Sequence, residues 1–228
     1  MRRRKKHRWI LFIPLAMAAF AVFFMIRELR LPAEIPYMRG SASYRAEGDW
    51  KTVLVNADHP LPADYSVSLL RLDNGEYVDE RIWPELQEMF DTARSQGISL
   101  YVRSGWRSAE DQQAIMDEMI AQYIEEGYSR EAAEAEAREW VAAPGTSEHE
   151  TGLAVDINAE EEAGSLRTYN WLKDNAHLYG FIQRYPEEKS SLTGIAYEPW
   201  HYRYVGKEAA AEIYDSGLCL EEYQSSQR

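Results

Sequence analysis

The sequence predicts an α+β domain in which helices flank a small, mostly antiparallel sheet. Five stretches between residues 84 and 216 have helical character, and six short stretches between 53 and 204 have strand character. Helices segregated from a small, mostly antiparallel sheet are typical of this class. About 180 residues follow the N-terminal region, which is enough to bury one hydrophobic core without disulfide bonds.

The N-terminal half of this domain begins with expected strands at 53–55 and 67–70. A helix at 84–96 follows, because Leu86, Met89 and Phe90 recur at helical spacing and Gly97 stands where the helix would end. Residues 98–103 alternate as a strand does, and Ser104-Gly105-Trp106-Arg107-Ser108 then turns into a helix at 108–126 with an apolar stripe. An alanine- and glutamate-rich helix is expected at 129–141.

The C-terminal half continues with a short buried strand at 153–157, which follows the turn-forming Pro144 and Gly145. A helix-like segment at 169–179 and a strand at 181–184 come next. The aromatic run at 197–204 is expected to be a strand with an irregular start, because it contains Pro199. A helix at 207–216 closes the domain.

The first 26 residues have the pattern of a membrane anchor. Residues 1–8 contain six Lys and Arg, and residues 9–26 contain no charge. Eighteen helical residues span about 27 Å, close to the roughly 30 Å of a hydrocarbon core. The charge bias predicts a cytoplasmic basic tail at 1–8 and a transmembrane signal anchor at 9–26 that crosses the cell membrane once. A linker at 27–49 would then lead to an extracytoplasmic domain at 50–228. A cleaved signal peptide is the alternative, since alanines occur within the apolar run.

Charge excludes one class of partner. The formal net charge is −13. Without the six basic residues of positions 1–8, 19 Lys and Arg face 38 Asp and Glu, which is −19. Such a surface repels phosphate backbones, so we expect no nucleic-acid partner. The chain contains a single cysteine, Cys219, which cannot form an internal disulfide.

Two strings in the C-terminal half contain candidate metal ligands. The first, SEHETGLAVD, includes His149 and Asp156, and the second, EPWHYRYVG, includes Glu198 and His201. A catalytic zinc ion takes three protein ligands and a water, so two imidazoles and one carboxylate fit that count, and Glu198 remains to act as the base. Glu198 and His201 lie three apart, so the chain must bend at Pro199 if both are to face one ion.

Arg107 is the candidate electrophile. It stands at the predicted strand-to-helix turn, where a guanidinium can bind a substrate carboxylate or stabilise an oxyanion. A surface arginine near Glu110 and Asp111 is the alternative interpretation. The other histidines are expected to be peripheral: His7 lies in the basic tail, His177 in a helix-like segment, and His59 has no carboxylate partner at ligand spacing.

Three strings together resemble the VanY-type D-alanyl-D-alanine carboxypeptidases: SGWRSAEDQ, PGTSEHETGLAVDI and YEPWHYRYVG. The resemblance covers about residues 50–215. It implies a hedgehog/DD-peptidase-like fold, zinc held by His149, Asp156 and His201, Glu198 as general base and then acid, and Arg107 in contact with the substrate. It also implies that Ser147, Gln112 and Trp200 line the substrate groove.

The function that the resemblance implies is a zinc metallocarboxypeptidase that removes the terminal D-alanine from peptidoglycan stem peptides of the cell wall. The same site could instead serve an L,D-carboxypeptidase, a D,D-dipeptidase or a peptidoglycan endopeptidase. A non-catalytic wall-binding module that keeps zinc for structure is an alternative of a different class. A serine penicillin-binding enzyme is disfavoured, because the chain has no Ser-x-x-Lys and no Lys-Thr-Gly.

Overall fold

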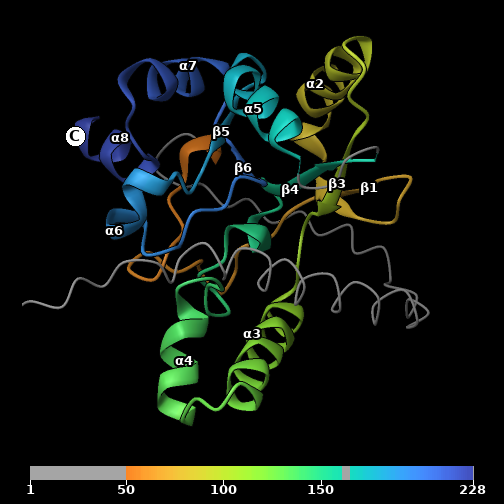
Figure 1. Ribbon diagram of the computed structural model, residues 1–228. Coiled ribbons are helices and arrows are strands. Elements are labelled where there is room, and N and C mark those ends of the chain that lie inside the picture. The colour runs from red at the N-terminus through yellow and green to blue at the C-terminus, as the bar shows by residue number, and fades with distance from the viewer. Residues whose placement is uncertain (1–49, 161–164, 228) are drawn as a thin grey trace, which may run out of the picture.

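The computed structural model describes residues 50–160 and 165–227 (Figure 1). The predicted basic tail at 1–8, transmembrane anchor at 9–26 and linker at 27–49 lie outside these described residues. Within the described part of the chain, none of the helices combines the length and the apolar character that crossing a bilayer requires.

The centre of the domain is an antiparallel sheet of four strands in the order β3-β4-β6-β5. These strands are β3 (Leu100–Ser104), β4 (Ala154–Ala159), β5 (Phe181–Gln183) and β6 (His201–Tyr204). A separate two-stranded hairpin pairs β1 (Leu69–Arg71) with β2 (Tyr77–Asp79). The small antiparallel sheets with flanking helices confirm the predicted α+β class.

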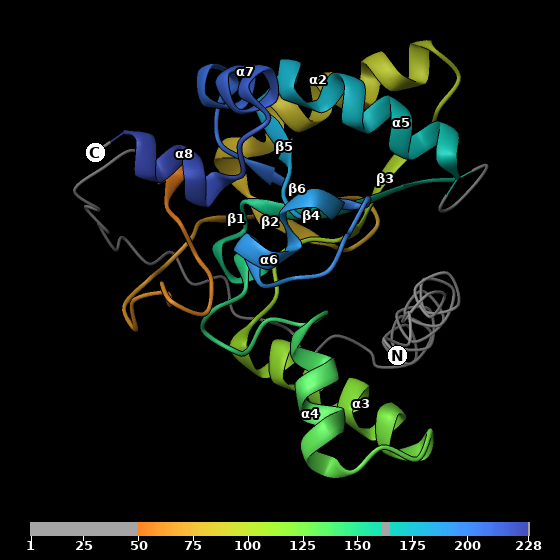
Figure 2. The same ribbon diagram turned by 60° about the vertical axis from the view of Figure 1, so that its left-hand side comes forward.

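Helices cover the sheet on one side and project from it on the other. In Figures 1 and 2, α2 (Trp83–Ser95), α5 (Leu166–Asn175) and α7 (Lys207–Ser216) lie on one side, whereas α3 (Ala109–Glu125) and α4 (Arg130–Arg138) extend from the opposite side as a hairpin. Two short helices, α6 (Ser190–Thr193) and α8 (Leu220–Ser226), and five 3₁₀ segments complete the described chain: Trp50–Thr52, Glu80–Ile82, Glu148–Thr151, Ala176–Tyr179 and Glu187–Lys189.

Strand alternation separates the core from the polar face of the sheet. Val155 and Ile157 of β4 point into the main hydrophobic core with residues of α2 and α5, and so do Tyr202 and Tyr204 of β6. Because successive side chains of a strand point to opposite faces, the residues of β4 and β6 that alternate with these core residues face the α3–α4 side. The sequence of the two central strands therefore places one polar side chain after another on that face.

The structure corrects the prediction at several places. The helix expected at 169–179 begins at Leu166 and ends as a 3₁₀ turn at Ala176–Tyr179, and helix α6 was not predicted. Residues 53–55 form no strand, because the Val53 carbonyl accepts a hydrogen bond of 2.8 Å from the Arg203 side chain instead of from a strand partner. Strand β2 and helix α8 were not predicted, since each is too short to show a period. The strand expected at 197–204 begins only at His201, and the residues before it form a turn.

Candidate metal centre

Asp156 and His201 are neighbours because of the register of the sheet. In the antiparallel pair of β4 and β6 they stand directly opposite one another, on the face turned away from the main core. Oδ1 of Asp156 lies 3.2 Å from Nδ1 of His201. Both side chains are buried. Two candidate ligands far apart in the sequence are thus brought together by strand pairing alone.

His149 reaches the same point from a 3₁₀ turn. The segment Glu148–Thr151 ends at Gly152, whose φ of +74° is in the left-handed region. A Cβ on Gly152 would lie 2.9 Å from the backbone nitrogen of Asp79, so the position needs glycine both for its dihedral angle and for its packing. The turn directs Nε2 of His149 to within 3.4 Å of Oδ1 of Asp156.

The three side chains form a donor set that fits a divalent metal ion. The ligand atoms that His149, Asp156 and His201 offer all lie within 4.8 Å of one another. Oδ1 of Asp156 is buried and has no hydrogen-bond partner among the described residues, although two imidazoles face it. A buried carboxylate oxygen in this state is stabilised by a cation. Two imidazoles and one carboxylate match catalytic zinc, with its fourth position left for water.

The outer nitrogens of both histidines are also directed. Nδ1 of His149 lies 2.7 Å from the carbonyl oxygen of Gly105 and must donate a proton to it, which leaves the lone pair on Nε2. The peptide of Gly105 is itself held, because its N–H donates to Glu76 at 2.9 Å. Nε2 of His201 faces Oε2 of Glu148 at 3.7 Å. Each imidazole therefore presents its inner nitrogen to the common point.

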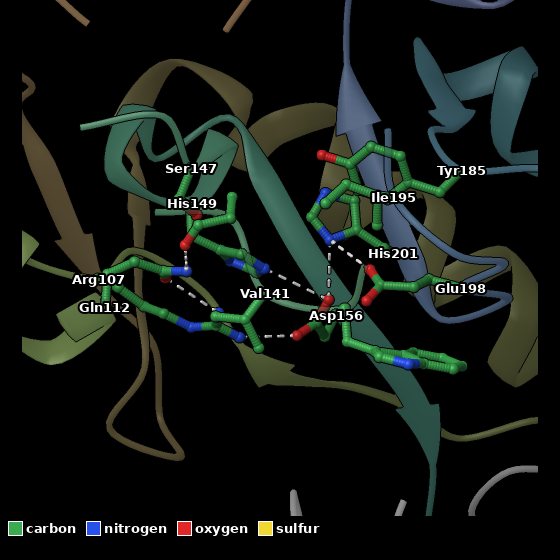
Figure 3. A pocket seen from close by; sticks show the side chains of 12 residues that line it. Arg107, Gln112, Val141, Ser147, His149, Asp156, Tyr185, Ile195, Glu198 and His201 are labelled. Atoms are coloured by element: carbon green, nitrogen blue, oxygen red, sulfur yellow. Dashed lines mark hydrogen bonds and ion pairs between the residues drawn. The ribbon is translucent and has the colours of Figure 1, made fainter. Parts of the chain in front are cut away.

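Glu198 lies beside the donor set without completing it. The backbone N–H of His201 donates to the carbonyl of Glu198 at 3.3 Å, which closes a turn over Pro199 and Trp200. The bend that the predicted site requires is therefore present. Oε2 of Glu198 lies 3.5 Å from Nδ1 of His201 (Figure 3). Burial raises the pKa of Glu198 to about 8, with Asp156 adding to the shift against the opposing effect of His201.

The surroundings of the donor set shift the pKa values of the two histidines in opposite directions. Burial lowers the pKa of His149 to about 4, and the nearby Arg107 adds to this effect. Burial also acts to lower the pKa of His201, but the adjacent carboxylates of Asp156 and Glu148 outweigh it and raise the pKa to about 9. Burial acts to raise the pKa of Asp156, yet the two histidines and Arg107 lower it well below its ordinary value.

Arg107 is anchored at the wall of the site by three hydrogen bonds. Its Nε donates to Ser104 Oγ at 3.0 Å and its Nη1 to Gln112 Oε1 at 3.3 Å. Its Nη2 donates to Oδ2 of Asp156 at 3.0 Å, so the guanidinium holds one oxygen of the carboxylate while the other faces the histidines (Figure 3). The interpretation of Arg107 as a surface residue is wrong, because only 6 % of the residue is exposed.

A pocket opens over the donor set, between the sheet and the base of the α3–α4 hairpin. Of the predicted site residues, it is lined by Arg107, Gln112, Ser147, His149, Asp156, Glu198 and His201. The sequence reasoning missed its apolar and aromatic wall, which consists of Trp140, Val141, Ala142, Tyr185 and Ile195. The run Trp140-Val141-Ala142 just before the Pro144-Gly145 turn is the sequence signal that could have indicated part of this wall.

One predicted groove residue lies elsewhere. Trp200 packs in the main hydrophobic core and is not among the residues that line the pocket. It immediately precedes His201, and neighbouring residues of an extended chain point to opposite sides. Of the three histidines expected to be peripheral, His7 lies outside the described residues. The other two are outside the pocket: His59 bonds to Asn56, and His177 stacks on Tyr214 at a ring separation of 3.6 Å.

Comparison with known proteins identifies close relatives. The sequence pattern of the VanY family, described as D-alanyl-D-alanine carboxypeptidase, matches residues 75–207. A D-alanyl-D-alanine carboxypeptidase of Enterococcus faecalis is 51% identical over 200 residues, which are 86% of this chain and 75% of the relative.

Two solved structures of VanY proteins superpose on this chain. VanYB in complex with D-alanine-D-alanine is 52% identical with a TM-score of 0.77, over 79% of this chain and 100% of that one. A glutamate-to-alanine mutant of the D,D-pentapeptidase VanY from a VanB-type resistance cassette, solved with Zn(II), is 53% identical with a TM-score of 0.75, over 77% of this chain and 99% of that one.

Proposed function

This chain belongs to the VanY family of D-alanyl-D-alanine carboxypeptidases, and we propose that it is a zinc-dependent carboxypeptidase that removes the terminal D-alanine from peptidoglycan stem peptides. The observation that carries the proposal is the convergence of His149, Asp156 and His201 in a pocket where Glu198 is a further, adjacent carboxylate. The relatives solved with Zn(II) and with D-alanine-D-alanine support the metal and the substrate class.

Four residues of the pocket take part in the chemical steps. His149, Asp156 and His201 would hold zinc, which would supply an activated water at neutral pH and a Lewis acid for the scissile carbonyl. Glu198 accepts the proton of the attacking water and returns it to the nitrogen of the leaving D-alanine. Burial raises the pKa of Glu198 in the metal-free pocket, and a bound divalent cation would favour the ionised carboxylate that a base requires.

The remaining pocket residues bind the substrate. The terminal carboxylate of the peptide is negative, and Arg107 is the cation among the lining residues, with Ser147 and Gln112 beside it as neutral hydrogen-bonding groups. Val141, Ala142 and Ile195 form an apolar wall that suits the methyl group of alanine. Burial of Arg107 strengthens its attraction for an anion, because little water screens it.

The proposal is tested with a synthetic muropeptide pentapeptide, by mass spectrometry, with and without a zinc chelator. The expected result is loss of one alanine that the chelator abolishes. In Glu198→Ala, turnover falls by about 10²–10⁴-fold while zinc stays bound, because the base is lost but the ligands are not. Full turnover by this variant would disprove the role of Glu198, and an intact pentapeptide in the presence of bound zinc would favour a binding module.

We further propose that residues 9–26 anchor the protein in the cell membrane with the catalytic domain outside. The support is the uncharged run and the six basic residues before it. Protease treatment of intact cells and of inside-out vesicles tests this placement. The domain is expected to be digested in intact cells only. Recovery from the medium of a chain that lacks residues 1–26 would favour the cleaved signal peptide.

A further inference from the structure

Two arginines with no exposed side-chain surface meet behind the metal centre. Nε of Arg184 and Nη1 of Arg203 each donate to the same oxygen of Glu148, Oε1, at 2.8 Å. All three side chains are 0% exposed. One carboxylate cannot neutralise two guanidiniums, and an uncompensated charge inside a protein is strongly unfavourable. The cluster therefore needs a second anion.

The short C-terminal helix α8 supplies that anion. Nη1 of Arg184 donates to Oε2 of Glu221 at 2.9 Å, and Nη2 donates to Oε1 at 2.7 Å, which is a bidentate pair. Asn56 donates a further hydrogen bond to Glu221 at 3.1 Å. With Glu221 in place, two guanidiniums face two carboxylates and the buried charges cancel. Figure 1 shows α8 beyond the β5 edge of the sheet, away from the α3–α4 hairpin.

The inner side of the cluster touches the metal centre. Both arginines bind Oε1 of Glu148, and its Oε2 is left to face Nε2 of His201 at 3.7 Å. Neither of these two atoms has another hydrogen-bond partner among the described residues. A carboxylate at the outer nitrogen of a histidine keeps the proton there and orients the ring, so that the inner nitrogen can bind metal.

We propose that Glu221 is a positioning residue for the metal ligand His201 and acts through Arg184 and Glu148. The proposal rests on the zinc site described above. When Glu221 is present, the charge of Arg184 is shared between two carboxylates, and Glu148 keeps an oxygen for His201. When the charge of Glu221 is removed, Glu148 is the one carboxylate left to pair with Arg184, and Arg184 competes with His201 for the oxygens of Glu148. The buried cluster then also carries a net positive charge close to a site that binds a cation.

The test compares Glu221→Gln with Glu222→Gln in the full chain. Both changes remove one negative charge from α8 and keep the size of the side chain. Glu222 is the matched control, because it pairs with Lys189 at 2.7 Å at the surface, where the two side chains are 30% and 23% exposed. Glutamine also preserves the capping position that Glu222 occupies at the start of α8. Two quantities are measured: zinc affinity by competition with a chromophoric chelator, and thermal unfolding of the zinc-free proteins.

The expected result is a zinc affinity about tenfold weaker in Glu221→Gln, at the lower end of the effect of outer-shell partners, and a change of less than about twofold in Glu222→Gln. A residue that only braced the fold would lower the unfolding temperature and leave the zinc affinity of the folded protein unchanged, and that outcome would overturn the inference. Equal weakening in both variants would overturn it too, because the effect would then be one of net charge. If the unmodified chain itself binds no zinc, the proposed function fails, and this inference fails with it.

Discussion

Gly105 has no space for a side chain, which makes Gly105→Ala a direct test of how His149 is held. A Cβ at this position would lie 2.1 Å from the carbonyl oxygen of Tyr77, whereas ordinary contact begins at 3.4 Å. The turn that carries Gly105 and the strand that carries Tyr77 must therefore separate by about 1.3 Å, the difference between these two distances. A shift of that size breaks the hydrogen bonds that join them.

Two effects follow from this separation. The backbone N–H of Trp106 loses the carbonyl of Tyr77, and the N–H of Gly105 loses Glu76, each at about 1–3 kcal/mol when a buried group is left unsatisfied. The carbonyl of Gly105 also moves away from Nδ1 of His149, from which it accepts a hydrogen bond of 2.7 Å in the unmodified protein. Zinc affinity is then expected to fall by about 10–100-fold, as it does when an outer-shell partner of a ligand is lost.

The assay measures zinc affinity by chelator competition and stability by urea unfolding. Gly127→Ala is the control, because Gly127 has a φ of +95° but no atom lies within 4 Å of its Cβ position. That variant is expected to lose roughly 1–2 kcal/mol of stability from its backbone dihedral angle alone and to bind zinc normally. Unchanged zinc affinity in Gly105→Ala, with a clear loss of stability, would refute the idea that the Gly105 carbonyl orients His149.

Three further predictions concern stability and the anchoring of Arg107. Zinc at about 100 times its Kd stabilises the folded protein by about 2.7 kcal/mol, which raises Tm by several degrees in differential scanning calorimetry; a Tm that a chelator leaves unchanged contradicts a bound metal. Arg107→Lys lowers kcat/KM by about 10–100-fold, because an ammonium cannot hold Ser104, Gln112 and Asp156 together. Surface Arg94→Lys, which keeps its pairing with Asp91, is the control, and equal activity of the two variants contradicts the role of Arg107. The stability difference between the wild-type protein and Glu221→Gln is expected to shrink as pH falls from 6 to 3 in urea unfolding.

The sign of this pH effect follows from the environment of Glu221. Burial acts to raise the pKa of Glu221, but hydrogen bonding and charge from Arg184 outweigh it and lower the pKa below its ordinary value. A carboxylate with a lower pKa in the folded state stabilises the protein above its unfolded pKa of about 4.3, and this stabilisation is lost as pH falls through the folded value. A stability difference that stays constant down to pH 3 would contradict an ionised pairing with Arg184.

Local sequence was sufficient for the parts of this protein that depend on neighbouring residues. The α-helices α2, α3 and α7 begin and end within two residues of the predicted ranges, because their apolar stripes and the glycines after them act within a few turns. The donor set was also predictable, since histidine and carboxylate in two short strings limit the chemistry that a metal site can have. The requirement for a bend at Pro199 followed from strand periodicity.

Tertiary structure decided how these residues are held. That Asp156 stands opposite His201 depends on the register of β4 and β6, and no local pattern encodes it. Trp200 was assigned to the groove but packs in the core, because its orientation is set by the turn before β6. Arg184, Arg203 and Glu148 read in the sequence as ordinary charged residues, yet they are fully buried and neutralised by Glu221, far along the chain. The chemical identity of a site resides in its side chains, whereas the orientation of each ligand depends on contacts between segments that meet only when the chain is folded.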